Sequence, residues 1–549
     1  MLSLKIEGKN VDLPADFQVT LNLKSPIFED VGSYTYPFKL PNSRRNAILF
    51  GFRHKVANTA DIHHEFPASF YWNGNVFFSG TAKMKLMATN SFEGYMLEGN
   101  GNFNYQRKKI DLRNIDFGSI NFETEYLRLA YINSCAKKAY PESIVAFPEI
   151  LNKSYFDELP ADIGLHYLNY YYSSVISITT LEYNRTVIVP MLYLRYVLDK
   201  IFQHLKLLFI DSFFAADAAY NALTLFNLVD CNCGEAGFFG YSTNQLLLNY
   251  HVPRMGLNDF FVGLENMFNL RFFVNNNTNT VRLLSVDSIL KTNDYIEFSD
   301  KLISLTIEPE DRITGFHLMM NMQTDDETYT IQEPYQEWVI KSIKPPVETI
   351  AELEPWPAAT VFDTRFVFAK DEYYILTSSK VWEPIQQMYY TWNLFSQWIY
   401  KNKDRTIETS FSSLMSENVN PYNAIIGNKR DEWEDVTPKL FFVRYQDEGA
   451  ANSRVSGRCF VAPQVVPTHN LFYGGENGLM NKHYKAYCDF RMSTKLVKVT
   501  KHMQYSELKD FDFSKKYMIN GIKYLVKSIQ VTIKIDRVMP AILEMYVCN

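Results

Sequence analysis

Alternating apolar and polar positions dominate the first part of the chain. The alternation is clear in residues 2–6, 17–23 and 66–72. A period of two residues is typical of strands that bury one face. Asn73–Gly74 separates two such runs and predicts a tight hairpin. Residues 1–122 are therefore expected to form a small β-barrel-like domain.

The period of the apolar positions changes to that of a helix in the middle of the chain. Residues 194–205 carry the clearest apolar stripe, in which Leu198, Ile201 and Phe202 are expected to be core residues. A strand is expected at 207–210. With the unit that follows, these elements predict an α+β domain over residues 123–299.

A second amphipathic helix runs directly into a hairpin between residues 257 and 286. Asn258 is the expected N-cap, because its side chain can accept from the first free backbone N–H groups. Asn269 is expected to end the helix in the left-handed conformation. A polar turn at 275–280 separates two alternating runs, which predicts a hairpin that packs on the helix.

Strand-like alternation returns after Asp300 and again at the C-terminus. Strands are expected over 302–307, 313–321 and 485–491, and Asn520–Gly521 is a further hairpin signal. We therefore expect a second β-barrel-like domain, formed by residues 300–345 together with 485–549. Residues 346–484 are expected to be an inserted, loop-rich and aromatic-rich domain. The predicted fold class is multidomain and mainly β with α+β parts.

Composition excludes several classes of protein. With 47% hydrophobic and 21% charged residues, the chain resembles a globular protein rather than a disordered one. A net charge of −6 argues against general nucleic-acid binding. The longest apolar run, 187–214, is interrupted by charged residues, so no membrane span is expected. Six cysteines without a CxxC pair predict free thiols rather than a disulfide framework.

Motifs that would carry chemistry are weak. His63, His64 and Glu65 are adjacent but lack the spacing of metal ligands. The acidic residues 325–327 lack the glycine and spaced oxygens of a calcium loop. The glycines of 474–478 do not follow a strand and open a helix as a phosphate loop does. No catalytic, cofactor-binding or metal-binding residue is predicted, and the chain is not expected to be an enzyme.

Besides subunit contact, the aromatic-rich insert leaves two functions open, carbohydrate binding and carbohydrate hydrolysis. Its tryptophans and tyrosines lie near carboxylates such as Glu383, Asp431 and Glu432. Aromatic rings can stack on sugars, and a pair of carboxylates can hydrolyse them. The same aromatic residues are enriched in protein interfaces. Subunit contact is weighted above carbohydrate binding, and both are weighted above hydrolysis.

Three segments resemble the hub proteins of bacteriophage tails and contractile injection machines. DVGSYTYPFKLPNSRRNAILFGF (residues 30–52) is similar to the N-terminal segment of tail or baseplate proteins of phages and prophages. Residues 255–290 resemble the helix and hairpin of the second domain of that family. NGIKYLVKSIQVTI (residues 520–533) resembles its last barrel hairpin. None of the three segments contains a catalytic or ligating residue.

The resemblance implies a structural virion protein, made in the cytoplasm of the host bacterium. Its expected role is that of a tail hub or baseplate ring subunit, which joins the tail tube to distal tail proteins. Its partners would be copies of itself, in a trimeric or hexameric ring, and other tail-tube and baseplate proteins. No cofactor and no specific nucleic-acid binding are implied, although DNA can pass through such a ring. The alternative is a carbohydrate- or receptor-binding protein of the phage tail.

The predicted subunit-interface residues are Tyr34, Tyr36, Phe38, Arg44 and Arg45. Aromatic and arginine side chains are enriched in interfaces, and this segment is difficult to explain as core. The competing interpretation, of equal weight for each residue, is that Phe38 and its neighbours close the end of the barrel. The two β-domains are expected to lie side by side around a central channel.

Overall fold

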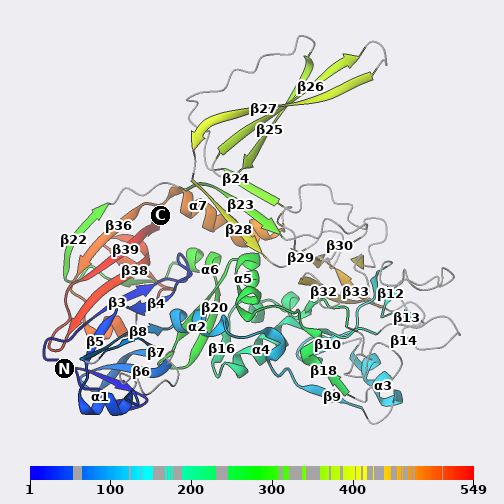
Figure 1. Cartoon of the computed structure of the whole chain (residues 1–549). Coiled ribbons are helices and arrows are strands. Elements are labelled where there is room, and N and C mark those ends of the chain that lie inside the picture. Colours follow the sequence, from blue (N-terminus) through cyan, green and yellow to red (C-terminus); the bar gives the residue numbers. More distant parts are fainter. Residues whose placement is uncertain are drawn as a thin grey trace.

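A curved sheet forms one side of the molecule in the computed structural model, and its 14 described strands come from both ends of the chain (Figure 1). One part of the sheet is formed by residues 2–98, and the other by 295–307 and 496–548. The middle of the chain packs beside this sheet as an α+β region. The fold is multidomain and mainly β with α+β parts, as the apolar periods predict.

The structure describes residues 1–52, 65–88, 90–122, 125–135, 138–152, 167–169, 171–172, 175–176, 188–229, 245–307, 313–320, 337–341, 359–369, 372–383, 388–401, 403–409, 412–413, 415–416, 424–425, 438–446, 454–458, 460–461, 468–471, 473, 477–509 and 511–548. The predictions for His63, His64 and the acidic residues 325–327 lie outside these residues.

The N-terminal part of the sheet curls into a barrel-like layer. Leu4, Phe70 and Phe92 are fully buried on its inner face, as the two-residue period predicts. The Leu2 N–H donates to the Ile535 carbonyl at 2.9 Å, which joins the first strand to the C-terminal region. The elements of this part are β1 (Leu2–Ile6), β2 (Lys9–Asn10), β3 (Gln18–Lys24), β4 (Ser33–Thr35), β5 (Phe38–Pro41), α1 (Arg44–Leu49), β6 (Glu65–Trp72), β7 (Asn75–Met87), β8 (Ser91–Glu98) and α2 (Asn100–Arg107).

Both predicted hairpin turns are confirmed. Asn73 and Gly74 join β6 to β7 with φ values of 49° and 84°. Asn520 and Gly521, with φ values of 51° and 80°, join two strands near the C-terminus. Positive φ at both central residues is the geometry of a type I′ turn, which Asn-Gly adopts at low cost.

The C-terminal part of the sheet is also strongly curled. Its strands are β21 (Tyr295–Glu297), β22 (Leu302–Ile307), β36 (Leu496–Lys501), β37 (Lys516–Ile519), β38 (Ile522–Lys534) and β39 (Ala541–Cys548), paired in the order β21-β37-β38-β39-β36-β22. In a flat sheet the two outer strands would lie about 24 Å apart. They are consecutive in the chain, and the link from Glu297 to Leu302 can span at most about 18 Å. The sheet must therefore curl.

One long strand belongs to both parts of the sheet. The first half of β38 pairs with β37 and β39, and the second half pairs with β3. The β3–β38 register runs from Gln18 opposite Lys534 to Lys24 opposite Ser528. The two predicted β-domains thus share a continuous sheet, whereas their exact boundaries stay a prediction.

The α+β region confirms most of the predicted elements. Its main elements are α3 (Glu125–Cys135), α4 (Leu194–His204), β16 (Leu208–Asp211), α5 (Leu257–Phe268), β19 (Leu270–Asn275), β20 (Thr280–Ser285) and α6 (Val286–Lys291). Leu198, Ile201 and Phe202 are buried, as predicted. Asn269 ends α5 in the left-handed conformation, with φ 51° and ψ 50°.

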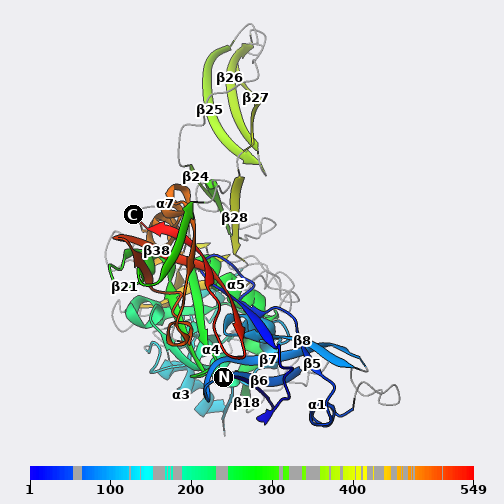
Figure 2. The ribbon, with the colours of Figure 1, turned by 90° about the vertical axis from the view of Figure 1, so that its left-hand side faces the viewer.

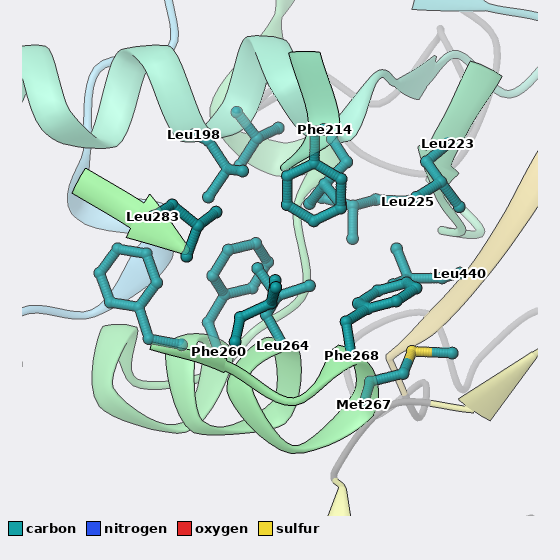
Figure 3. Close-up of a cluster of buried hydrophobic side chains, with 14 of the residues drawn as sticks. Leu198, Phe214, Leu223, Leu225, Phe260, Leu264, Met267, Phe268, Leu283 and Leu440 are labelled. Carbon is teal, nitrogen blue, oxygen red and sulfur yellow. The ribbon is translucent and has the colours of Figure 1, made fainter. Parts of the chain in front are cut away.

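The apolar stripe of α5 organises the core of this region. Figure 3 shows Phe260, Leu264 and Phe268 of α5 facing Leu198 of α4 and Leu283 of β20. Leu440, from β32 (Lys439–Gln446), completes the cluster, because β32 pairs with β17 (Leu223–Leu225). The C-terminal end of the predicted insert is therefore part of this core.

Two local predictions were wrong. The N-cap of α5 is Gly256, and Asn258 lies within the first turn, where its side-chain oxygen accepts from Nε of Arg107 at 3.0 Å. Residues 485–491 form a helix, α7 (Lys485–Ser493), rather than a strand. Its buried residues are Tyr487, Cys488, Arg491 and Met492, whose spacing is helical.

The described strands between residues 313 and 470 lie outside the large sheet. β23 (Ile313–Met320) pairs with β24 (Glu337–Lys341) and with β28 (Lys403–Thr409), although its sequence was assigned to the second β-domain. Within the predicted loop-rich insert, β25 (Ala359–Ala369), β26 (Glu372–Glu383) and β27 (Met388–Lys401) form an antiparallel sheet. This sheet extends away from the rest of the molecule (Figures 1 and 2).

Side-chain amides connect the α+β region to its neighbours. The Asn100 side chain donates to the Phe272 carbonyl and accepts from the Val274 N–H, so that it covers the edge of β19. The Asn269 amide donates to the His483 carbonyl at 2.8 Å. The His483 ring lies 3.2 Å from the Tyr220 hydroxyl and contacts Phe268. These contacts join segments that are far apart in sequence.

We predict that Phe202→Ala lowers the free energy of unfolding by about 3–5 kcal/mol, because it empties a buried aromatic site. The Phe202 ring packs against Phe209 and Phe261 at centroid distances of 4.4 and 5.5 Å. Chemical denaturation is the measurement. Leu208→Ala is the control, because Leu208 is 64% exposed and should change the free energy by less than about 0.5 kcal/mol. A loss below about 1 kcal/mol for Phe202→Ala would contradict the packing.

We also predict that acid destabilises the α+β region through its buried histidines. Burial lowers the pKa of His483 to about 3, and it lowers the pKa of His251 to about 3 as well. In the unfolded chain both take up a proton near pH 6.5, whereas the folded chain does not. The free energy of unfolding should therefore fall by about 1.4 kcal/mol per histidine for each pH unit between about 6.5 and 3.

Denaturation curves at pH 7.5 and pH 5 test this prediction. His483→Gln should reduce the pH dependence of the free energy of unfolding relative to wild type. His204→Gln is the matched control, since His204 is exposed and its change should leave the pH dependence intact. An unchanged pH dependence in His483→Gln would show that His483 is not the source of the acid sensitivity.

Candidate interaction surface

Residues 30–52 form a connected piece of the N-terminal layer that contains β4, β5 and α1. β4 pairs with β3 and β8, and β5 pairs with β8. α1 begins after Ser43, whose hydroxyl accepts from the Asn46 N–H at 3.2 Å. The sequence predicts an N-cap at either Asn42 or Ser43, because both can cap a short helix that carries Ile48, Leu49 and Phe50, and the structure places the cap at Ser43.

A buried asparagine anchors α1 to the barrel. The Asn46 amide group donates to the carbonyls of Asp12 and Pro41, both at 2.9 Å, and its oxygen accepts from the Asp12 N–H at 2.9 Å. Asn46 is fully buried. Phe50 adds an apolar anchor, with its ring 5.4 Å from Phe66 and 4.8 Å from Phe92. The helix is therefore held in a defined position.

Large apolar side chains are exposed on this anchored segment. The exposed fractions are 65% for Val31, 40% for Tyr36, 57% for Ile48 and 39% for Phe52. Val31, Ile48 and Phe52 were not among the predicted interface residues. The burial of Ala47 in α1 and of Phe50 directly after it places Ile48 on the outer face, which a six-residue helix does not reveal by its period alone.

Tyr34 and Tyr36 lie together at the junction of the two parts of the sheet. Their ring centroids are 5.8 Å apart in an edge-to-face arrangement. The Tyr34 hydroxyl accepts from the buried Asn22 amide at 2.8 Å, and the Tyr36 N–H donates to the Thr20 carbonyl at 2.8 Å. The pair thus lies along β3, which also pairs with β38, the strand shared by both parts of the sheet.

Phe38 is a core residue, which corrects its selection as an interface candidate. It is 3% exposed, and its ring packs edge-to-face against Phe17 and Phe70 at 6.0 and 5.7 Å. The alternation along β5 points Phe38 and Leu40 inward and Lys39 outward. The competing interpretation, in which Phe38 fills the barrel, holds for this residue.

Arg44 and Arg45 are exposed on α1. Arg45 forms an ion pair with Asp12 at 2.9 Å, and Asp12 also accepts from the Ser43 hydroxyl at 2.6 Å. The exposed arginines and the tyrosine pair thus belong to different elements of one segment. Both the arginines and the tyrosines project from backbone that is anchored to neighbouring segments of the N-terminal layer.

Of the adjacent residues His63, His64 and Glu65, the structure describes Glu65, whose carboxylate is hydrogen-bonded to two other side chains. Lys109 donates to its carboxylate at 2.7 Å, and the Tyr105 hydroxyl donates as well. Burial alone raises the pKa of Glu65, but these hydrogen bonds outweigh it, so that the pKa lies below its usual value. Within the described residues, His, Cys, Asp and Glu do not gather in a group of three that could hold a metal. Among the helices of the same residues, none is long and apolar enough to cross a membrane.

Sequence comparison finds no match: neither a protein-family model nor a curated protein corresponds to this chain. Structure comparison finds phage tail proteins of low similarity. The chain is similar to the 43 kDa tail protein of prophage MuSo2 from Shewanella oneidensis, with 8% identity, a TM-score of 0.35, and coverage of 99% of this chain and 97% of that one.

Two further solved structures show the same level of similarity. A tail protein from Neisseria meningitidis MC58 has 8% identity and a TM-score of 0.33, with coverage of 99% of this chain and 95% of that one. Prophage tail protein gp18 from Listeria monocytogenes EGD-e has 7% identity and a TM-score of 0.33, with coverage of 99% and 94%.

Proposed function

We propose that this chain is a non-enzymatic structural subunit of a bacteriophage tail. Its specific role would be a hub or baseplate ring component of the virion, which joins the tail tube to distal tail proteins. The proposal starts from the three segments whose sequences resemble tail hub proteins. Each forms a defined unit here: residues 30–52 an anchored surface, 255–290 a helix with its hairpin, and 520–533 the turn and long strand of the β37–β38 hairpin.

The observation that carries a role in assembly is the exposed apolar and basic surface of residues 30–52. Tyr36, Ile48 and Arg44 are exposed, while Asn46 and Phe50 hold the same segment in place. A contact surface on rigid backbone loses little conformational freedom when it binds. The proposed partners are further copies of the chain in a ring, a trimer or alternatively a hexamer, together with neighbouring tube and baseplate proteins.

A carbohydrate- or receptor-binding role on the phage tail is the second candidate. The observation that favours it is the sheet of β25, β26 and β27, which extends away from the body of the molecule (Figure 2). Such a position suits contact with a cell surface. Binding of the full chain to an array of bacterial glycans would favour this role, and an array without binding would favour assembly alone.

We predict that replacing Tyr36, Arg44 and Arg45 together by alanine abolishes ring formation and leaves the chain folded. The Arg45–Asp12 pair is exposed, so its loss should cost at most about 1 kcal/mol of stability. Electron microscopy of the purified chain reports the rings, and circular dichroism reports the fold.

A matched triple variant controls for the loss of one tyrosine and two basic residues. Tyr295, Lys485 and Arg537 are exposed and lie outside residues 30–52, and their replacement by alanine should leave ring formation intact. Wild-type chains that stay monomeric, or a Tyr36/Arg44/Arg45 variant that assembles like wild type, would contradict the proposed interface.

A further inference from the structure

β22 is an outer strand of the large sheet. It pairs with β36 on one side, and it ends the strand order of the sheet as described (Figure 1). The outer edge of such a strand presents backbone N–H and C=O groups in the direction of a missing neighbour. β22 is therefore a ready template for another strand.

Apolar side chains of β22 are exposed although they point to the core face of the sheet. Leu305 lies opposite Val499 and Ile307 lies opposite Val497, and both valines are buried. Leu305 is nevertheless 37% exposed and Ile307 67% exposed. Ile303, beside a bulge in the same strand, is 51% exposed. The inner apolar row of the sheet thus continues to its edge and ends in solvent.

Apart from the bulge near its start, the strand lacks the features that usually protect an edge. Its sequence, LISLTI, contains no charged residue and no proline, whereas natural edge strands commonly carry lysine, proline or a covering segment. Another edge in this chain is covered. The Asn100 side chain hydrogen-bonds along β19, the outer strand of its sheet. The contrast indicates that the edge of β22 is used for binding.

We propose that β22 pairs with β22 of a second copy of this chain, in an antiparallel arrangement about a two-fold axis. A two-fold axis normal to the sheet keeps inner residues opposite inner residues, so the register must centre on one residue. Centred on Leu305, the register places Leu305 opposite its own copy, Ile303 opposite Ile307, and Ser304 opposite Thr306.

The pattern of the strand selects a second copy over an unrelated partner. In this register each pair within residues 303–307 joins like with like: branched apolar residues on the inner face and small hydroxyl residues on the outer face. Such pairs stabilise antiparallel strands, whereas like charges directly opposite destabilise them. The strand is uncharged, its residues 303–307 are symmetric in residue type about Leu305, and this part is therefore complementary to itself.

This contact is separate from the proposed ring. A two-fold contact joins chains in pairs and cannot close a ring, whereas head-to-tail contacts can. A chain with both contacts would form two rings face to face. If the strand pairing is wrong, rings form without pairs. If the proposed ring is wrong, pairs form without rings. The failure of one proposal is therefore distinguishable from the failure of the other.

Sedimentation of the purified full-length chain tests the proposal. Wild-type species should contain an even number of chains. Leu305→Lys should halve the number of chains in each species, because it places two lysines opposite each other. Ile542→Lys is the matched control: Ile542 is also 37% exposed but lies on β39, inside the sheet, and its variant should associate like wild type.

A mixture of charge variants separates pairing from damage to the fold. Leu305→Glu alone should also lose the pair, and an equimolar mixture of Leu305→Lys and Leu305→Glu chains should recover it through opposite charges. A wild-type species with an odd number of chains would overturn the proposal. So would a Leu305→Lys variant that associates like wild type, or a mixture that does not recover the pair.

Discussion

The pairing of β3 with β38 is the interaction on which the rest of the architecture depends. It joins residues near the two ends of the chain, and the Thr20 and Thr532 hydroxyls meet at 2.8 Å across a separation of 512 positions. The entropic cost of closing a loop grows only with the logarithm of the loop length. The cost of this distant contact is therefore offset once many residue pairs form together. The pairing merges the apolar faces of both parts of the sheet into one core, which contains Leu21 and Val531.

The continuous sheet determines where the middle of the chain can lie. α2 follows directly from β8, and its Asn100 side chain binds the edge of β19 in the α+β region. His483 then contacts Asn269 and Tyr220 of the α+β region. From His483 the chain continues through α7 into the last strands of the sheet. The molecule is therefore a set of parts that share strands and contacts, and a contact surface on one part is held rigidly relative to the others.

The two proposed contact surfaces follow different physical principles. The surface of residues 30–52 presents side chains from a segment whose backbone is already satisfied, with Asn46 as its buried clamp. The outer edge of β22 presents the backbone itself, together with an apolar row that no strand of the described residues adjoins on that side. Side-chain surfaces select partners by shape and charge, whereas a strand edge selects them by register.

The sequence alone determined the features whose physics is local. Asn-Gly turns, the Ser43 cap, the left-handed Asn269 and the stripe of α4 depend on neighbouring residues, and all were predictable. For the candidate surface, the sequence indicated the segment but not the direction of Phe38, or of Ile48 in a helix too short for a clear period. Residues 485–491 were misassigned because strand and helix patterns overlap in so short a run. Only the tertiary structure decided that β38 is shared, that Phe38 fills the core and that β22 lies at an edge, because pairing partners and burial are set by residues far away in the chain.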